Sequence, residues 1–145
     1  LVIGVVTERL ARFGIRPLAV AIFCMTAFII VQADIVFGLS GTVLPMWVVY
    51  AFFGTSGIVS FAVLSQSFPP DMTGRVLTGI NVLVFSFSFL GQWITGAVID
   101  LWPPTAGGGY APEGYTASFA ILLGLQVLAL AWFTLATWRG WGVVK

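Results

Sequence analysis

VLTGINVLVFSFSFLGQWITGAVI, residues 76–99, is an uncharged stretch that lies between Arg75 and Asp100. As a helix, with a rise of about 1.5 Å per residue, it would be about 36 Å long. The hydrocarbon core of a bilayer is about 30 Å thick, so this stretch is long enough to cross it with some tilt. The sequence therefore predicts a membrane-spanning helix here, around which the other segments are arranged.

One face of this predicted helix is polar. At about 100° per residue, one side carries amide, hydroxyl and small residues together with one phenylalanine, and the opposite side carries only apolar ones. Lipid offers no hydrogen-bonding partner, so the polar side should face protein or water. The polar side holds Asn81, Phe85, Ser88, Gln92, Thr95 and Gly96, and the apolar side holds Ile80, Leu83, Phe87, Leu90, Ile94 and Ala97.

The composition is that of an integral membrane protein. Hydrophobic residues make up 59% of the chain and charged residues only 8%, against about 25% charged in a soluble domain. Mean hydropathy is +1.07. The chain has no histidine and a single cysteine, Cys24, no lysine lies inside a span, and the acids Asp34 and Asp100 lie only toward the ends of the spans. We therefore expect no metal, no cofactor, no nucleic-acid partner and no enzymatic activity.

The apolar runs predict an all-α, polytopic bundle with four full spans and the end of a fifth helix at Leu1–Val6. In the first span Thr26 and Gln32 do not share a face, which favours a peripheral, lipid-facing helix. In the second span Trp47, Tyr50, Gly54, Gly57 and Phe61 share one face, where the glycines would let another backbone approach. The four spans are expected at about residues 17–38, 42–66, 76–100 and 117–138.

The charges predict the orientation of these spans. Of the six Lys and Arg residues, three lie before the first span, Arg75 lies between the second and third spans, and two lie after the last span. Because the chain crosses the membrane four times, these three segments are on the same side. The opposite connections hold only Asp34, Asp100 and Glu113. By the positive-inside rule, both ends are cytoplasmic, and we expect a plasma (inner) membrane location.

Two segments resemble the major facilitator superfamily. GVVTERLARFGIR, residues 4–16, is similar to the family's signature loop through Gly4, Glu8, Arg9 and Arg12, although Glu8 replaces the usual Asp and Ile15 interrupts the basic run. FPPDMTGR, residues 68–75 with Gly74 and Arg75, looks like the family's loop between helices 10 and 11. The alternative is that residues 4–16 are an ordinary basic cytoplasmic loop.

The resemblance implies a carboxy-terminal fragment of a twelve-helix transporter fold. The spans would be helices 9 to 12, and the protein would be a secondary permease that works by alternating access. Its partners would be the lipid bilayer, the amino-terminal half of the same transporter and a small-molecule solute. The resemblance also implies that Tyr50, Asn81, Ser88 and Gln92 border the substrate pathway. Interhelical hydrogen bonding by the polar residues, and packing by Tyr50, remain open alternatives, as does a membrane scaffold or assembly subunit whose polar face binds a partner helix.

The predicted orientation can be tested with single cysteines. In a Cys24→Ala background on intact cells, an impermeant thiol reagent should label Gly109→Cys and leave Arg75→Cys unlabelled, because residue 109 is predicted to be external and residue 75 cytoplasmic. Labelling at 75 alone would invert the topology.

Overall fold

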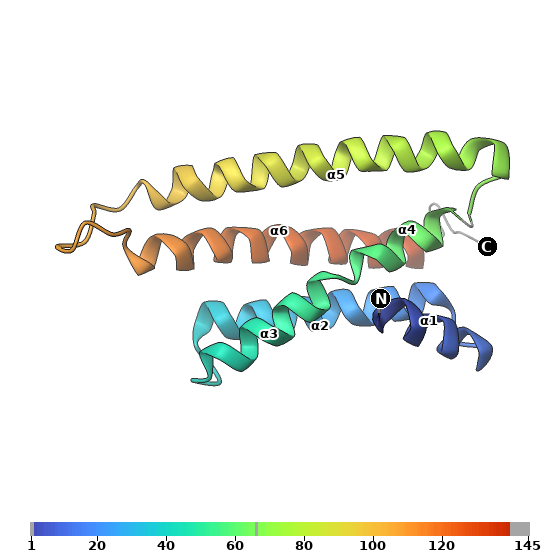
Figure 1. Ribbon diagram of the computed structural model, residues 1–145, viewed down its shortest axis with the longest axis horizontal. Helices are drawn as coiled ribbons and strands as arrows, with labels where there is room; N and C mark the ends of the chain where they lie inside the picture. The colour runs from blue at the N-terminus through green and yellow to red at the C-terminus, as the bar shows by residue number, and fades with distance from the viewer. Residues whose placement is uncertain (1, 66, 140–145) are drawn as a thin grey trace. The chain divides into compact units, whose positions relative to one another are not determined.

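The structure is a computed structural model that describes residues 2–65 and 67–139. Its elements are all α-helical, and four segments are long and apolar enough to cross a membrane, in agreement with an integral membrane protein. Those segments are α2, α3 together with α4, α5, and α6. The helices are α1 (Val2–Arg12), α2 (Pro17–Phe37), α3 (Val43–Gly54), α4 (Gly57–Ser65), α5 (Pro70–Ile99) and α6 (Pro112–Trp138) (Figure 1).

A proline is the first residue of α2, α5 and α6. The ring fixes φ near the helical value, and the missing N–H is one that the first turn does not need. Consequently α5 begins at Pro70 and α6 at Pro112, before the predicted starts at 76 and 117. Residues 70–75 and 112–116 are helical rather than loop, which corrects the sequence-based boundaries.

Glycine in a left-handed conformation ends α1 and α2. Gly14 has φ +82°, and the N–H of Ile15 donates to the carbonyl of Leu10 at 3.1 Å, a Schellman motif. Gly38 has φ +62° and follows the last residue of α2, so the span predicted to end at 38 ends at Phe37. The predicted helix tail at Leu1–Val6 is longer in the structure, because α1 continues to Arg12; Leu1 lies outside the described residues.

The second span is interrupted, where the sequence predicted one helix over 42–66. Between α3 and α4 the hydrogen bonds change to an i→i−3 pattern, with the Ser56 N–H donating to Phe53 at 3.0 Å and the Val59 N–H to Ser56 at 2.9 Å. Gly54 and Gly57 bracket the interruption, and glycine weakens a helix because it has the most backbone freedom to lose. Residue 66, the predicted end, lies outside the described residues.

The chain divides into two units at Gly79 and Ile80, within α5. In the first unit α2 contacts α1, α3 and α4, and α1 contacts α4. Ile3, Ala21 and Val59 form a buried apolar cluster there. The first span therefore contacts each of the other helices that lie wholly in its unit and is the most buried of the four, although most of its surface is still open.

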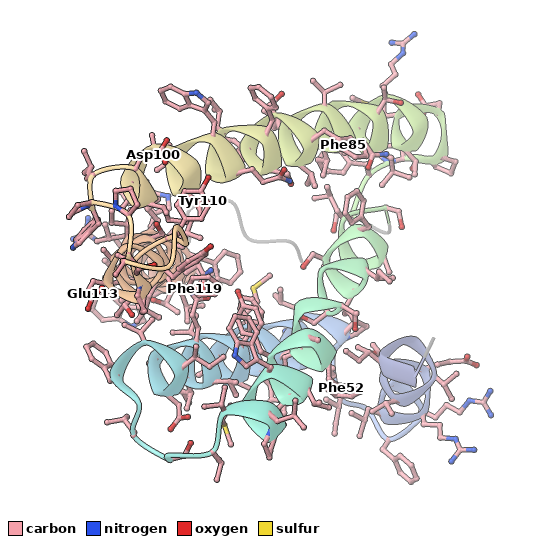
Figure 2. All side chains as sticks on the ribbon, turned by 60° about the vertical axis from the view of Figure 1, so that its left-hand side comes forward. Phe52, Phe85, Asp100, Tyr110, Glu113 and Phe119 are labelled. Carbon is pink, nitrogen blue, oxygen red and sulfur yellow. The ribbon has the colours of Figure 1, made fainter. Side chains whose placement is uncertain are left out.

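In the second unit, the end of α5 packs on the start of α6. A Cβ at Gly114 would lie 3.1 Å from the Cα of Ile99, so the two backbones approach closely. One turn later Ser118, only 2% exposed, donates to the carbonyls of Gly114 at 2.9 Å and Thr95 at 3.3 Å. Figure 2 shows the acidic residues Asp100 and Glu113 at this same end of the two helices.

Replacing Gly114 tests this packing. Gly114→Leu should lower the thermal unfolding temperature of the purified protein, because overpacking a close helix contact costs about 1–3 kcal/mol. Gly124→Leu on the same helix is the matched control, since a Cβ there meets no atom within 4 Å. Equal unfolding temperatures for the two variants would contradict this contact.

Candidate functional site

The polar face of α5 is the strongest candidate site. Asn81, Ser88 and Gln92 are all exposed. Few of the other residues of α5 are buried. Within residues 2–65 and 67–139, no side-chain hydrogen bond involves any of the three. Phe85, which helical spacing places on the same side, is also exposed. The structure therefore presents these predicted residues together, as a polar stripe of Asn81, Ser88 and Gln92 with no partner in the described part of the chain.

The face differs at its carboxy-terminal end. The backbone carbonyl of Thr95 accepts the Ser118 hydroxyl hydrogen bond from α6, and Ile99 is buried against Gly114. α6 therefore covers this face near the acidic end of the unit, whereas Asn81, Ser88 and Gln92 are exposed in the described part of the chain.

Tyr50, on α3, lies in a packed cluster rather than on an open surface. Its ring stacks on Phe28 at 4.4 Å with an interplanar angle of 23°, and Trp47 meets it edge-on at 5.7 Å. Its hydroxyl lies 3.5 Å from Oε1 of Gln32. These contacts favour the packing interpretation of Tyr50 that the sequence left open.

Gln32 is the residue that sequence reasoning undervalued. It is 0% exposed and contacts Tyr50 across two helices. A single glutamine inside an apolar span requires a hydrogen-bonding partner. This requirement could have predicted from the sequence that Gln32 is buried against another helix. The sequence predicted that another backbone would approach the glycine face of the second span. In the structure Gly54 instead faces the Phe28 ring, which a Cβ would meet at 3.4 Å.

Three hydroxyl side chains lie at or near the interruption between α3 and α4 in the second span. Ser56 is 6% exposed, and Ser60 Oγ, one turn later, is buried without a hydrogen-bond partner in the described chain. The Thr55 hydroxyl donates to the carbonyl of Phe52 at 2.7 Å. Irregular backbone inside a membrane is tolerated where it is covered by protein or lines a polar cavity, so this segment is a second candidate feature.

The family-like motif residues lie on helices rather than in loops. Gly4, Glu8, Arg9 and Arg12 are all on α1, and Arg12 pairs with Glu8 at 2.9 Å, so Glu8 contacts its own helix. A Cβ at Gly4 would meet no atom within 4 Å. The second motif is also helical, because Gly74 and the exposed Arg75 lie on α5. As at Gly4, a Cβ at Gly74 would meet no atom within 4 Å.

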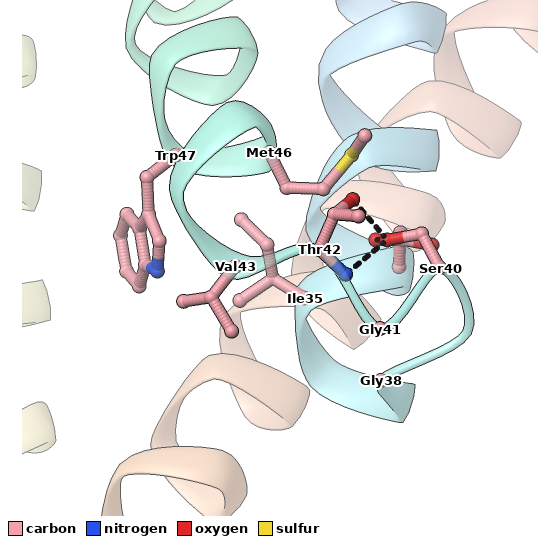
Figure 3. A pocket seen from close by; sticks show the side chains of 9 residues that line it. Ile35, Gly38, Ser40, Gly41, Thr42, Val43, Met46 and Trp47 are labelled. Atoms are coloured by element: carbon pink, nitrogen blue, oxygen red, sulfur yellow. Dashed lines mark hydrogen bonds between the residues drawn. The ribbon is translucent and has the colours of Figure 1, made fainter.

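A small pocket lies at the turn between α2 and α3 (Figure 3). Its volume is about 70 Å³. The Ser40 hydroxyl donates to Asp34 Oδ2 at 2.7 Å, and the Thr42 hydroxyl lies 3.2 Å from Ser40 Oγ. Val43, Met46 and other apolar residues complete the lining. In the described part of the chain, no group of three or more His, Cys, Asp or Glu side chains is arranged to hold a metal ion.

Comparisons with known proteins add no assignment to this geometry. No family model, no curated protein and no solved structure matches the chain.

Proposed function

We propose that this chain is the carboxy-terminal part of a secondary active transporter of the major facilitator type, which moves a small solute by alternating access. The observation that carries the proposal is the polar stripe of α5. Asn81, Ser88 and Gln92 share one exposed face of a candidate span and have no hydrogen-bonding partner in the described chain.

The cost of facing lipid argues for a polar environment along this stripe. Moving an amide or hydroxyl from water into an apolar environment without a hydrogen bond costs about 2–7 kcal/mol. The three side chains of the stripe would each bear this cost if they faced lipid. Water, a solute or another protein segment must therefore satisfy them in the membrane. A solute pathway supplies the first two, and uncharged amide and hydroxyl groups suit a polar solute without a strong charge.

The interrupted second span supports the same proposal. Transporters place substrate sites near the bilayer midplane, where helices are broken. The interruption between Gly54 and Gly57 is near the middle of Val43–Ser65, and Ser60 Oγ is buried there without a partner within residues 2–65 and 67–139. In this proposal the stripe faces a pathway whose other side comes from the amino-terminal half, and the break makes the second span a discontinuous helix of the kind that transporters use.

In this proposal the resemblance of residues 4–16 and 68–75 to the facilitator loops would make the spans helices 9 to 12. Under this assignment α3 with α4 is helix 10 and α5 is helix 11, the two that border the pathway in that family. The lipid bilayer surrounds the remaining faces. The exposed large apolar side chains Leu83, Phe87 and Leu90, opposite the stripe, suit such a boundary.

The alternative is a scaffold or assembly subunit in which the stripe binds a partner helix. The contact between Ser118 and the Thr95 carbonyl favours this alternative, because it is an interhelical hydrogen bond on the same face of α5. The two functions differ in whether water reaches the stripe.

Cysteine accessibility distinguishes a pathway from a helix interface. In the Cys24→Ala background of the membrane-embedded full-length protein, cysteines at Asn81, Ser88 and Gln92 should react with a charged methanethiosulfonate, because thiolates form only where water is present. Cysteines at Leu83, Phe87 and Leu90, on the opposite face, should not react. Unreactive stripe cysteines that form disulfides with another membrane helix would instead support the scaffold.

Two glutamine variants test the role of the stripe in transport. Gln92→Leu in the full-length protein should reduce uptake strongly while insertion stays normal, because leucine is the less costly residue in hydrocarbon. Gln126→Leu is the matched control: its Oε1 is buried without a partner in the described chain, so its loss should leave uptake unchanged and stability equal or higher. Paired uptake and thermal-unfolding measurements check both. If Gln92 only bonds another helix, its loss should cost about 1 kcal/mol of stability with little change in uptake.

A further inference from the structure

The end of α1 and its connection to α2 form an exposed basic surface that is separate from the polar stripe. It holds Arg9, Arg12 and Arg16 against a single acid, Glu8, which gives a net charge of +2 over residues 8–16. All four side chains are exposed. Glu8 is occupied by Arg12 at 2.9 Å, and no ion pair involves Arg9 or Arg16 in the described chain.

An exposed aromatic residue lies between the second and third of these arginines in the sequence. Phe13 is 84% exposed, and Ile15 beside it is also exposed. The reversal at Gly14, with φ +82°, fixes the two apolar residues in the short segment between Arg12 and Arg16. In water an exposed phenylalanine gains nothing, whereas at a membrane interface it inserts below the headgroups while neighbouring cations stay among them.

The position along the chain places the surface at headgroup depth. Arg16 immediately precedes Pro17, the first residue of a candidate span, so the connection lies at the membrane–water boundary whichever way the span points. We propose that Arg9, Arg16 and Phe13 form a docking surface for anionic phospholipids, in which the guanidinium groups bind the headgroup phosphates and the ring enters the interface.

The chemistry selects this occupant. Guanidinium groups bind phosphate oxygens through paired N–H donors, and each basic side chain near an anionic membrane surface strengthens binding about fivefold. An acidic peptide or a second copy of the chain would also meet the charge. Neither explains why the aromatic ring is displayed between cations directly beside a span. The inference rests on the membrane-spanning α2 and does not depend on transport.

A local fluorophore provides the test. The full-length protein with Cys24→Ala and Ala11→Cys, labelled with an environment-sensitive dye on the exposed surface of α1, is titrated in dodecylmaltoside micelles with phosphatidylglycerol. Half-saturation should need about 25-fold more phosphatidylglycerol after Arg9→Gln and Arg16→Gln together, from about fivefold for each arginine. Glu8→Gln should shift half-saturation severalfold the other way, because it releases Arg12. Thermal unfolding confirms that each variant is folded.

Three control titrations keep the inference falsifiable. Phosphatidylcholine should give no saturable response, and neither glycerol phosphate nor inorganic phosphate should compete at the same concentration. Equal responses to the two lipids, an unchanged double variant, or competition by the soluble phosphates would each overturn the lipid surface. A response that follows protein concentration instead of lipid would assign the surface to a second copy of the chain.

Discussion

Hydrocarbon offers no hydrogen-bonding partner, and the arrangement of polar groups in this chain depends on that constraint. Where two helices of one unit meet, the constraint is satisfied within the chain. Gln32 contacts the Tyr50 hydroxyl, and Ser118 donates to backbone carbonyls of its own helix and of α5. Both are fully or almost fully buried, as expected of polar groups that link helices in a membrane.

The same constraint gives meaning to the polar groups that have no partner in the described chain. The stripe of Asn81, Ser88 and Gln92 and the buried Ser60 hydroxyl lie in candidate spans. A helix with such groups is incomplete as an independent membrane element, because something polar must meet it. A solute pathway and a partner helix both meet that need, and they differ only in the presence of water.

The charged residues are distributed unevenly between the two ends of the candidate spans. The arginines before α2 and the one at the start of α5 lie at one set of helix ends, and Asp34, Asp100 and Glu113 lie at the other ends. Glu113 is also in the first turn of α6, where a carboxylate complements the helix dipole. By the positive-inside rule this charge pattern favours one orientation of the spans. Arg9 and Arg16, which form no ion pair within residues 2–65 and 67–139, would give that boundary the chemistry to select lipids in the surface proposed above.

The sequence alone determined the helical class, the number and approximate place of the candidate spans, and the polar face of α5, because hydrophobic run length and helical period are local properties. It could not place the helix starts at Pro70 and Pro112, since the polar residues after each proline are compatible with either a loop or a first turn. Only the tertiary structure packed the first span against α1, α3 and α4 and brought Gln32 to Tyr50, eighteen residues away, because burial depends on which helices become neighbours. The interruption at Gly54–Gly57 also required the structure: two glycines permit a break, and surrounding packing decides whether the helix adopts it.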